Sequence, residues 1–165
     1  MSIKLGMKNG KEFMASWPSY QELKTIDEDK RTIEFVFSDE TIDRDKEVIK
    51  VDGWDIKNYK KNPVVLWAHN HTGLPVGRSE KTQVEEKALK GRVLFTSEDT
   101  GNSLGEAVFN LYKNKFLNCG SVGFIGLEDH WAEEREKDPK VRRTFLRQEL
   151  LEYSCCPVPA NPGAH

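Results

Sequence analysis

The chain has 165 residues, 37% hydrophobic and 32% charged, which suits one domain with a full core and argues against a disordered chain. The net charge of -2 provides no broad basic field for a phosphate backbone, so we expect no nucleic-acid partner. No stretch approaches the roughly 20 apolar residues that cross a bilayer. Three cysteines, two of them sequence neighbours, are expected to stay reduced. We therefore expect a soluble intracellular protein without a membrane partner.

The sequence predicts a polar N-terminal segment followed by a series of short strands. Residues 1–30 are polar and are expected to form an N-terminal arm or edge segment, with the main domain at 31–165. Alternation and apolar runs predict strands at the ranges 31–37, 47–51, 64–67 and 87–95. The range 70–81, with two glycines and a proline, predicts a loop.

One helix is expected, at residues 103–118. Ser103 and Glu106 have the spacing of a capping box, and Leu104, Val108 and Leu111 have the spacing of an amphipathic stripe. The charge-dense range 129–143 predicts a solvated excursion, and 144–158 predicts one or two strands. Many short strands with one helix predict an α+β domain with a small, curved or barrel-like, mostly antiparallel sheet.

The stretch "NCGSVGFIGL" places Ser121 between two glycines at the start of an expected strand. A serine nucleophile needs a base within hydrogen-bond reach. Of the four histidines, His165 is terminal and His130 falls in the charged excursion. His69 follows the strand "VVLW" and is the better candidate, although a plain turn at Ser121 and a surface-loop histidine remain open alternatives.

A metal centre is a second interpretation of the histidines. His69 and His71 form an H-x-H pair, which with His130 or Asp99 and a water could hold a hydrolytic zinc ion. The ligand set is incomplete, so we expect no metal and no other cofactor.

The third member of a hydrolytic triad would be an acid that orients the imidazole. "RQELLEYSCC" supplies Glu149 and Glu152, which would lie on opposite faces of a regular strand because they are three residues apart. Only one of them could then face His69, and both could equally be charges on a strand edge.

Three stretches together, "GWDIKNYKKNPVVLWAHN", "NCGSVGF" and "ELLEYSCCPVPANP", resemble the motifs of the tailed-phage prohead proteases. These are capsid-maturation serine peptidases related in fold to the herpesvirus assemblins. The resemblance implies an assemblin-like fold with Ser121 as nucleophile, His69 as base and Glu152 as acid, Glu149 being the alternative acid. It also points to backbone N–H groups near Arg142 and Arg143 as the oxyanion hole.

The resemblance further implies the substrates and the place of action. The enzyme would cleave a scaffold protein or the scaffolding segment of the major capsid protein, and its own ends, inside the procapsid in the host cytoplasm. Self-association is expected as well. A catalytically silent capsid-binding or scaffold-binding domain of the same fold, and a metal hydrolase using His69 and His71, are the alternatives.

Overall fold

The computed structural model of the protein describes residues 3–8, 11–16, 25–43, 45–133 and 140–157. Its strands up to the middle of the chain are β1 (Ile3–Lys8), β2 (Lys11–Ser16), β3 (Thr25–Asp27), β4 (Thr32–Asp39), β5 (Glu47–Ile49), β6 (Trp54–Asp55) and β7 (Val64–Trp67). The later strands are β8 (Gly77–Glu85), β9 (Ala88–Phe95), β10 (Gly120–Trp131) and β11 (Arg143–Cys155). The helices are α1 (Ser103–Lys113) and the short 3-10 turns η1 (Val51–Gly53), η2 (Tyr59–Lys61) and η3 (Glu98–Thr100). In these described ranges, no helix has the length and apolar character needed to cross a membrane.

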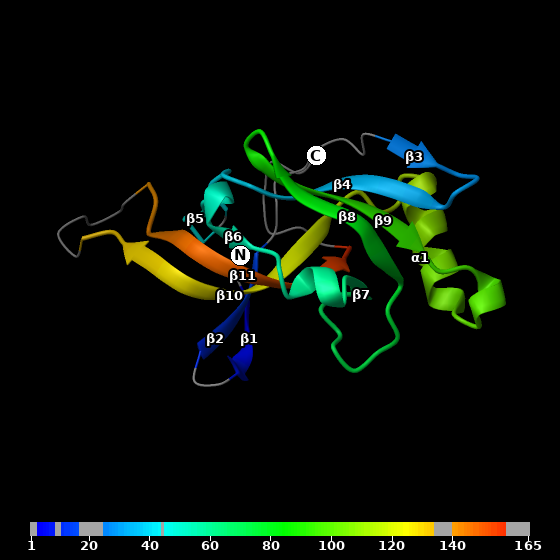
Figure 1. Cartoon of the computed structure of the whole chain (residues 1–165), viewed down its shortest axis with the longest axis horizontal. Helices are drawn as coiled ribbons and strands as arrows, with labels where there is room; N and C mark the ends of the chain where they lie inside the picture. Colours follow the sequence, from blue (N-terminus) through cyan, green and yellow to red (C-terminus); the bar gives the residue numbers. More distant parts are fainter. Residues whose placement is uncertain (1–2, 9–10, 17–24, 44, 134–139, 158–165) are drawn as a thin grey trace.

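All eleven strands of the described ranges join in one sheet, in the order β1-β2-β10-β11-β7-β8-β9-β4-β3. β5 and β6 lie off this path and pair with β11. The sheet curls into a half-barrel with α1 at one end (Figure 1). The expected α+β fold with a curved, mostly antiparallel sheet is therefore confirmed.

Strand β11 is the centre of this arrangement. It pairs antiparallel with β10 along most of its length, and parallel with β5, β6 and β7. On its other side β10 pairs with β2, with Val122 opposite Ser16 and Ile125 opposite Phe13. Part of the expected N-terminal arm is thus built into the sheet beside β10.

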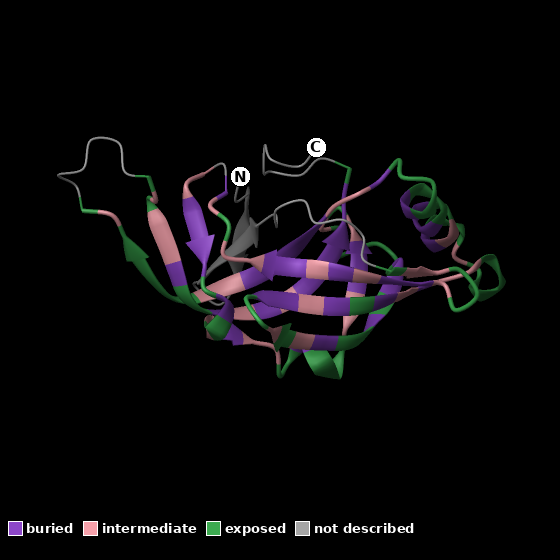
Figure 2. Ribbon diagram, turned by 90° about the horizontal axis from the view of Figure 1, so that it is seen from above, coloured by how far each residue is buried: buried purple, intermediate pink, exposed green. Residues whose placement is uncertain are grey.

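The core lies on one side of β10 and β11, where apolar and aromatic side chains alternate inward. Val122, Phe124, Leu150 and Tyr153 are almost fully buried, and the Tyr153 ring stacks on Phe37 with centroids 3.9 Å apart. Burial is concentrated in the middle of the sheet, while the far end of β10 is exposed (Figure 2). The side chains on the opposite side of these two strands are therefore not needed for packing this core.

Helix α1 begins at the expected residue but buries a different face. Its buried residues are Gly105, Val108, Phe109 and Tyr112, whereas Leu104 and Leu111 are 39% and 38% exposed. The N-cap residue makes no side-chain cap hydrogen bond, and Glu106 forms an ion pair with Arg31 at 2.9 Å. The predicted capping box is therefore wrong, and of the predicted apolar stripe only Val108 is buried.

The predicted strands at 31–37, 47–51, 64–67 and 87–95 are confirmed within a few residues at each end. The prediction of a loop over 70–81 is wrong in its last part, because β8 begins at Gly77. The buried residues of β8 are Gly77, Ser79 and Thr82, and a register shift between Ser79 and Lys81 breaks their alternation. These small or polar residues give no apolar periodicity, which is why the sequence did not predict the strand.

Candidate active site

Ser121 is the second residue of β10 and lies on the side of the strand opposite the core. Its neighbour Val122 points into the core, and successive side chains of a strand alternate between faces. In the ladder Ser121 lies directly opposite Ser154 of β11, so the two side chains share one face. Both residues are fully buried.

His69 is brought to the same region by the end of β7. The Ala68 N–H donates to the Cys155 carbonyl at 2.8 Å, which extends the pairing of β7 with β11 by one residue. Ala68 and His69 then both adopt left-handed backbone angles, with φ of 50° and 59°. This conformation is unfavourable for residues with a side chain and needs support from the surrounding structure. Part of that support is a hydrogen bond from the His69 backbone N–H to the Ser154 hydroxyl, at 3.0 Å.

Glu152 holds the imidazole directly. Its Oε1 lies 2.6 Å from Nδ1 of His69, and the two side chains are only 3% and 5% exposed. Its Oε2 accepts a hydrogen bond from the Ser154 hydroxyl at 2.6 Å. Gly123 lies opposite Glu152 in the ladder, and a Cβ at Gly123 would fall 2.1 Å from Oε1. The glycine therefore provides the space that the carboxylate occupies.

This geometry fixes the role of each ring nitrogen. A carboxylate only accepts hydrogen bonds, so the short contact to Glu152 places the proton of a neutral imidazole on Nδ1. Nε2 then keeps its lone pair and can accept a proton. A serine hydroxyl within its reach would be activated as a nucleophile, and the carboxylate would stabilise the imidazolium that results.

The alternative acid, Glu149, lies elsewhere. Its Oε1 accepts a hydrogen bond from the Asn58 side chain at 2.9 Å. The ladder shifts register between Gly123 and Phe124, which leaves Leu151 as an extra residue in β11. Because of this β-bulge, the alternation returns Glu149 to the side of Glu152. The expectation that the two acids lie on opposite faces of a regular strand is thus wrong, and distance along the strand separates them instead.

Arg142 and Arg143 are not brought to this site. Arg143 pairs with Trp131, at the opposite end of the ladder from Ser121 and Ser154. Eleven residue steps along β11 separate Arg143 from Ser154, which at about 3.3 Å per residue is roughly 35 Å measured along the strand. The Arg143 guanidinium instead donates to Asp129 at 2.6 Å and lies over the Trp131 and Phe145 rings. The expected oxyanion role of these arginines is therefore corrected.

The residues weighed as metal ligands are dispersed. His71 lies in the exposed loop after His69, His130 pairs with Thr144 near the far end of β10, and Asp99 lies in η3. Within the described ranges no group of three or more histidine, cysteine or acidic side chains could hold a metal ion. His165 falls outside the described residues.

The three cysteines are free, and they lie next to the site. Cys119 precedes β10 and is partly exposed, and its thiol donates to the Cys156 carbonyl at 3.2 Å. A hydrogen bond from the Cys156 thiol lowers the pKa of Cys119, whereas burial raises the pKa of Cys155 to about 12. Burial also raises the pKa of Cys156. Cys119 is therefore the thiol that ionises most readily.

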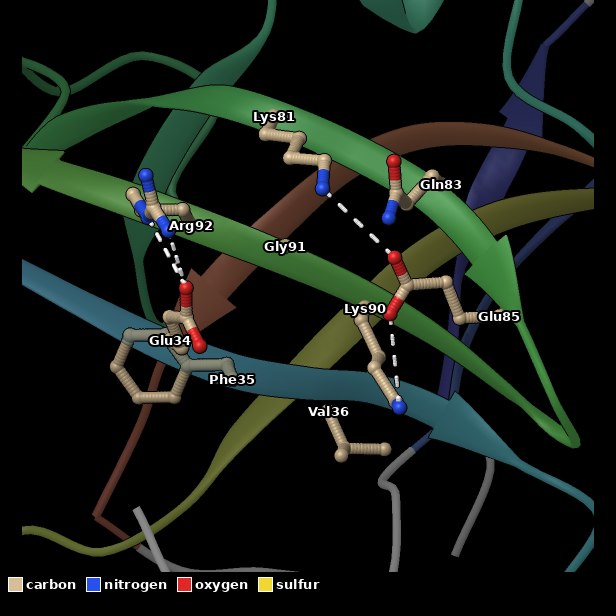
Figure 3. A pocket seen from close by; sticks show the side chains of 9 residues that line it. All are labelled: Glu34, Phe35, Val36, Lys81, Gln83, Glu85, Lys90, Gly91 and Arg92. Atoms are coloured by element: carbon tan, nitrogen blue, oxygen red, sulfur yellow. Dashed lines mark hydrogen bonds and ion pairs between the residues drawn. The ribbon is translucent and has the colours of Figure 1, made fainter. Parts of the chain in front are cut away.

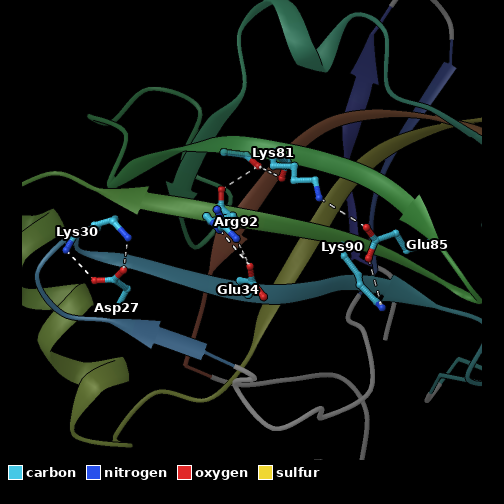
Figure 4. A network of polar contacts seen from close by, with 8 residues as sticks. Asp27, Lys30, Glu34, Lys81, Glu85, Lys90 and Arg92 are labelled. Atoms are coloured by element: carbon cyan, nitrogen blue, oxygen red, sulfur yellow. Dashed lines mark hydrogen bonds and ion pairs between the residues drawn. The ribbon is translucent and has the colours of Figure 1, made fainter.

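A shallow pocket lies elsewhere, on β4, β8 and β9 (Figure 3). It is lined by Glu34, Phe35, Val36, Lys81, Gln83, Glu85, Lys90, Gly91 and Arg92. Its charges pair with one another: Arg92 with Glu34 at 2.5 Å, and Lys81 and Lys90 with Glu85 at 3.7 and 3.6 Å (Figure 4). These exposed pairs contribute little to stability. None of the candidate site residues lines this pocket, whose charged side chains all form ion pairs on the sheet surface.

Two residues of the site were not predicted from the sequence. Ser154 bonds both His69 and Glu152, and Gly123 makes room for the carboxylate. The spacing E-x-S at 152 and 154 is a signal that could have indicated Ser154, because residues two apart share a face of a strand. The role of Gly123 depends on cross-strand register, which no local pattern reveals.

Comparison with known proteins agrees with this arrangement. Residues 20–165 match the family model of the caudovirus prohead serine proteases. The prohead protease of Escherichia phage T5 is 30% identical over 125 residues, which cover 72% of this chain and 53% of that protein. The capsid polyprotein of Pseudomonas phage PAJU2 is 28% identical over 147 residues, covering 87% of this chain and 20% of that protein. The chain thus spans about half of the first relative and a fifth of the second.

A solved structure shares the fold. The capsid assembly protease of bacteriophage T4 superposes with a TM-score of 0.62 over 89% of this chain and 98% of that one, at 12% sequence identity. At that identity the likeness concerns the fold alone. The family match covers nearly the whole chain and includes β7, β10 and β11, the strands that carry the candidate site. The chain belongs to the caudovirus prohead serine protease family.

Proposed function

We propose that this protein is a serine endopeptidase in which Ser121 is the nucleophile, His69 the general base and Glu152 the orienting acid. The observation that carries the proposal is the buried contact of 2.6 Å between His69 and Glu152, beside the face of the sheet on which Ser121 lies. The burial of both side chains argues against the alternative that His69 is an ordinary surface-loop histidine. Membership of a serine protease family supports the same assignment.

The reaction would follow from these positions. Nε2 of His69 takes the proton of the Ser121 hydroxyl as the oxygen attacks the peptide carbonyl, and then gives that proton to the leaving amine. Water, deprotonated by the same nitrogen, would hydrolyse the acyl-enzyme and restore the serine. Glu152 keeps its contact with Nδ1 and supports the transient charge on the ring.

The substrates that we propose are capsid-assembly proteins: a scaffold protein or the scaffolding segment of the major capsid protein, and the ends of the enzyme itself. One relative is named a prohead protease and another a capsid polyprotein, which supports this substrate class. The setting would be the procapsid of a phage, inside the host cytoplasm. Self-association there would be favoured by the exposed Leu104, Leu111 and Phe116 at α1.

An extended substrate would bind by adding a strand to β10 next to Ser121. The backbone groups on that side of β10, from Val122 to Ile125, pair with β2 in this structure. A substrate strand that bound there would have to take the place of β2.

The test combines a covalent probe with a natural substrate. A fluorophosphonate should label the wild-type protein at Ser121, as identified by peptide mass spectrometry, and should not label Ser121→Ala. Co-expression with the capsid and scaffold proteins of the same phage should give truncated products only with the wild-type enzyme. A folded wild-type protein that neither labels nor cleaves would support the silent capsid-binding domain, and activity lost to a chelator would support a metal hydrolase.

A further inference from the structure

We infer that Ser154 is a positioning residue that holds Glu152 and His69 in their working geometry. This inference rests on the proposed function, because it concerns the same catalytic pair. Ser154 is fully buried, lies directly opposite Ser121, and forms hydrogen bonds with both His69 and Glu152.

The directions of the two hydrogen bonds are fixed by chemistry. A backbone N–H can only donate, so the Ser154 oxygen accepts the bond from His69 at 3.0 Å. A carboxylate can only accept, so the single Ser154 proton points to Oε2 of Glu152 at 2.6 Å. The short distance is typical of a charge-assisted bond.

These bonds close a ring around the catalytic pair. The His69 backbone donates to Ser154, Ser154 donates to Oε2 of Glu152, and Oε1 of Glu152 contacts Nδ1 of the same histidine. Both carboxylate oxygens are thereby engaged, so the carboxylate cannot rotate without breaking a bond. The ring also supports the left-handed backbone of His69, whose φ is 59°.

The position of Ser154 is itself fixed from two sides. It pairs with Ser121 of β10 and with Leu66 of β7. The backbone of Ser154 is thus paired with the strand of the nucleophile, while its side chain bonds the acid of its own strand and the segment that carries the base. Loss of its hydroxyl should leave the sheet intact but let the carboxylate and the imidazole shift relative to Ser121.

A purely structural role would give a different result, and Ser79 provides the matched control. Ser79 is a buried strand serine, 5% exposed, whose hydroxyl lies 2.7 Å from that of Thr82 and 2.9 Å from the Lys81 carbonyl. These partners lie in β8, a strand that carries none of His69, Glu152 and Ser154. Ser79→Ala therefore removes a comparable buried hydroxyl away from the catalytic pair.

The first measurement is steady-state hydrolysis of a peptide substrate. Ser154→Ala should lower kcat by roughly ten- to a hundredfold, as small misplacements of catalytic groups do, with KM nearly unchanged. Ser154→Thr, which keeps the hydroxyl, should restore most of kcat. Ser79→Ala should match wild type in kcat even if its melting temperature falls as much as that of Ser154→Ala. Should Ser154→Ala be too unstable to assay, Ser154→Cys, which keeps the size but donates weakly, takes its place with the same expected loss.

The second measurement does not depend on activity. In protein labelled with ¹⁵N-histidine, the Nδ1 proton of His69 should give a downfield resonance that disappears in His69→Gln and moves in Ser154→Ala, but stays in place in Ser79→Ala. An unmoved resonance together with kcat within twofold of wild type would overturn the positioning role. If Ser121→Ala retained full peptidase activity, the proposed nucleophile would fail instead, and the resonance would still decide the role of Ser154.

Discussion

At the scale of single residues, the two acids of β11 differ in the partner that each holds. Glu152 contacts His69 at 2.6 Å, whereas Glu149 accepts a hydrogen bond from Asn58 and is only half-buried. Glu152→Gln keeps the shape of the side chain but removes the charge that supports the imidazolium. We expect kcat to fall between roughly a hundredfold and ten-thousandfold. Glu149→Gln is the matched control and should retain nearly full activity. Similar losses in both variants would contradict the assignment of the acid.

Gly123 provides a second test, because it controls the space around the carboxylate. A Cβ at this position would lie 2.1 Å from Oε1 of Glu152, so Gly123→Ala should push the carboxylate away from His69 and lower kcat strongly. Gly126→Ala on the same strand is the control, since its Cβ would meet only the Phe145 ring, at 3.1 Å or more. Circular dichroism should show both variants folded. Equal activity of the two variants would contradict this role of Gly123.

The sequence predicted Ser121, His69 and Glu152 by residue type and motif, and the structure brings His69 and Glu152 into contact. For Ser154 the sequence offers only the E-x-S spacing with Glu152, because the hydrogen bond from His69 to Ser154 depends on the register between β11 and β7. Cross-strand contacts join residues far apart in the chain, and no local pattern encodes their distances.

At the scale of elements, β2 covers the side of β10 on which a substrate strand would bind. A variant that lacks residues 1–16 should therefore hydrolyse a peptide substrate faster than the whole chain, chiefly through a lower KM. The same truncation with Ser121→Ala should be inactive, which controls for contaminating proteases. A truncated protein with an unchanged melting temperature and no faster hydrolysis would show that β2 does not compete with substrate.

Helix α1 shows why an amphipathic pattern can predict the element but not its buried face. At Gly105 the helix comes so close to the residues that flank β8 and β9 that a Cβ would lie 1.8 Å from the Thr96 hydroxyl and 2.7 Å from the Val76 carbonyl. The buried face runs from this glycine through Val108 and Phe109 to Tyr112. A glycine adds nothing to a hydrophobic pattern, so the leucines at 104 and 111 gave the prediction the wrong face.

At the scale of the whole molecule, the site depends on strands that are remote in sequence. β7, β10 and β11 supply its residues, and β7 joins β11 by parallel pairing across more than 80 residues of chain. No part of the chain can form the site alone. We therefore expect fluorophosphonate labelling and the native tryptophan fluorescence, to which the buried Trp54 contributes, to be lost at the same urea concentration. Labelling that persisted beyond the fluorescence transition would show that the site survives in a partly unfolded state.

The overall architecture was predictable because strand count, turn residues and one helical stretch together indicate a curved sheet with one helix. The sheet order and the β-bulge at Leu151 were not, because they result from pairings between distant segments. That bulge also reversed the predicted relation between Glu149 and Glu152. In this protein the composition of each segment indicates its type, and long-range pairing decides which side chains meet.

The position of Cys119 affects how inhibitors would classify the peptidase activity that we propose. It is the partly exposed thiol of lowered pKa, and it lies two residues before Ser121. An alkylating reagent attached there would place a bulky group at the entrance to the serine. Maleimides would then abolish hydrolysis, and an inhibitor panel would report a cysteine peptidase. Cys119→Ser would remove the sensitivity to maleimides while leaving turnover intact. This result would show that the Cys119 thiol is not the nucleophile.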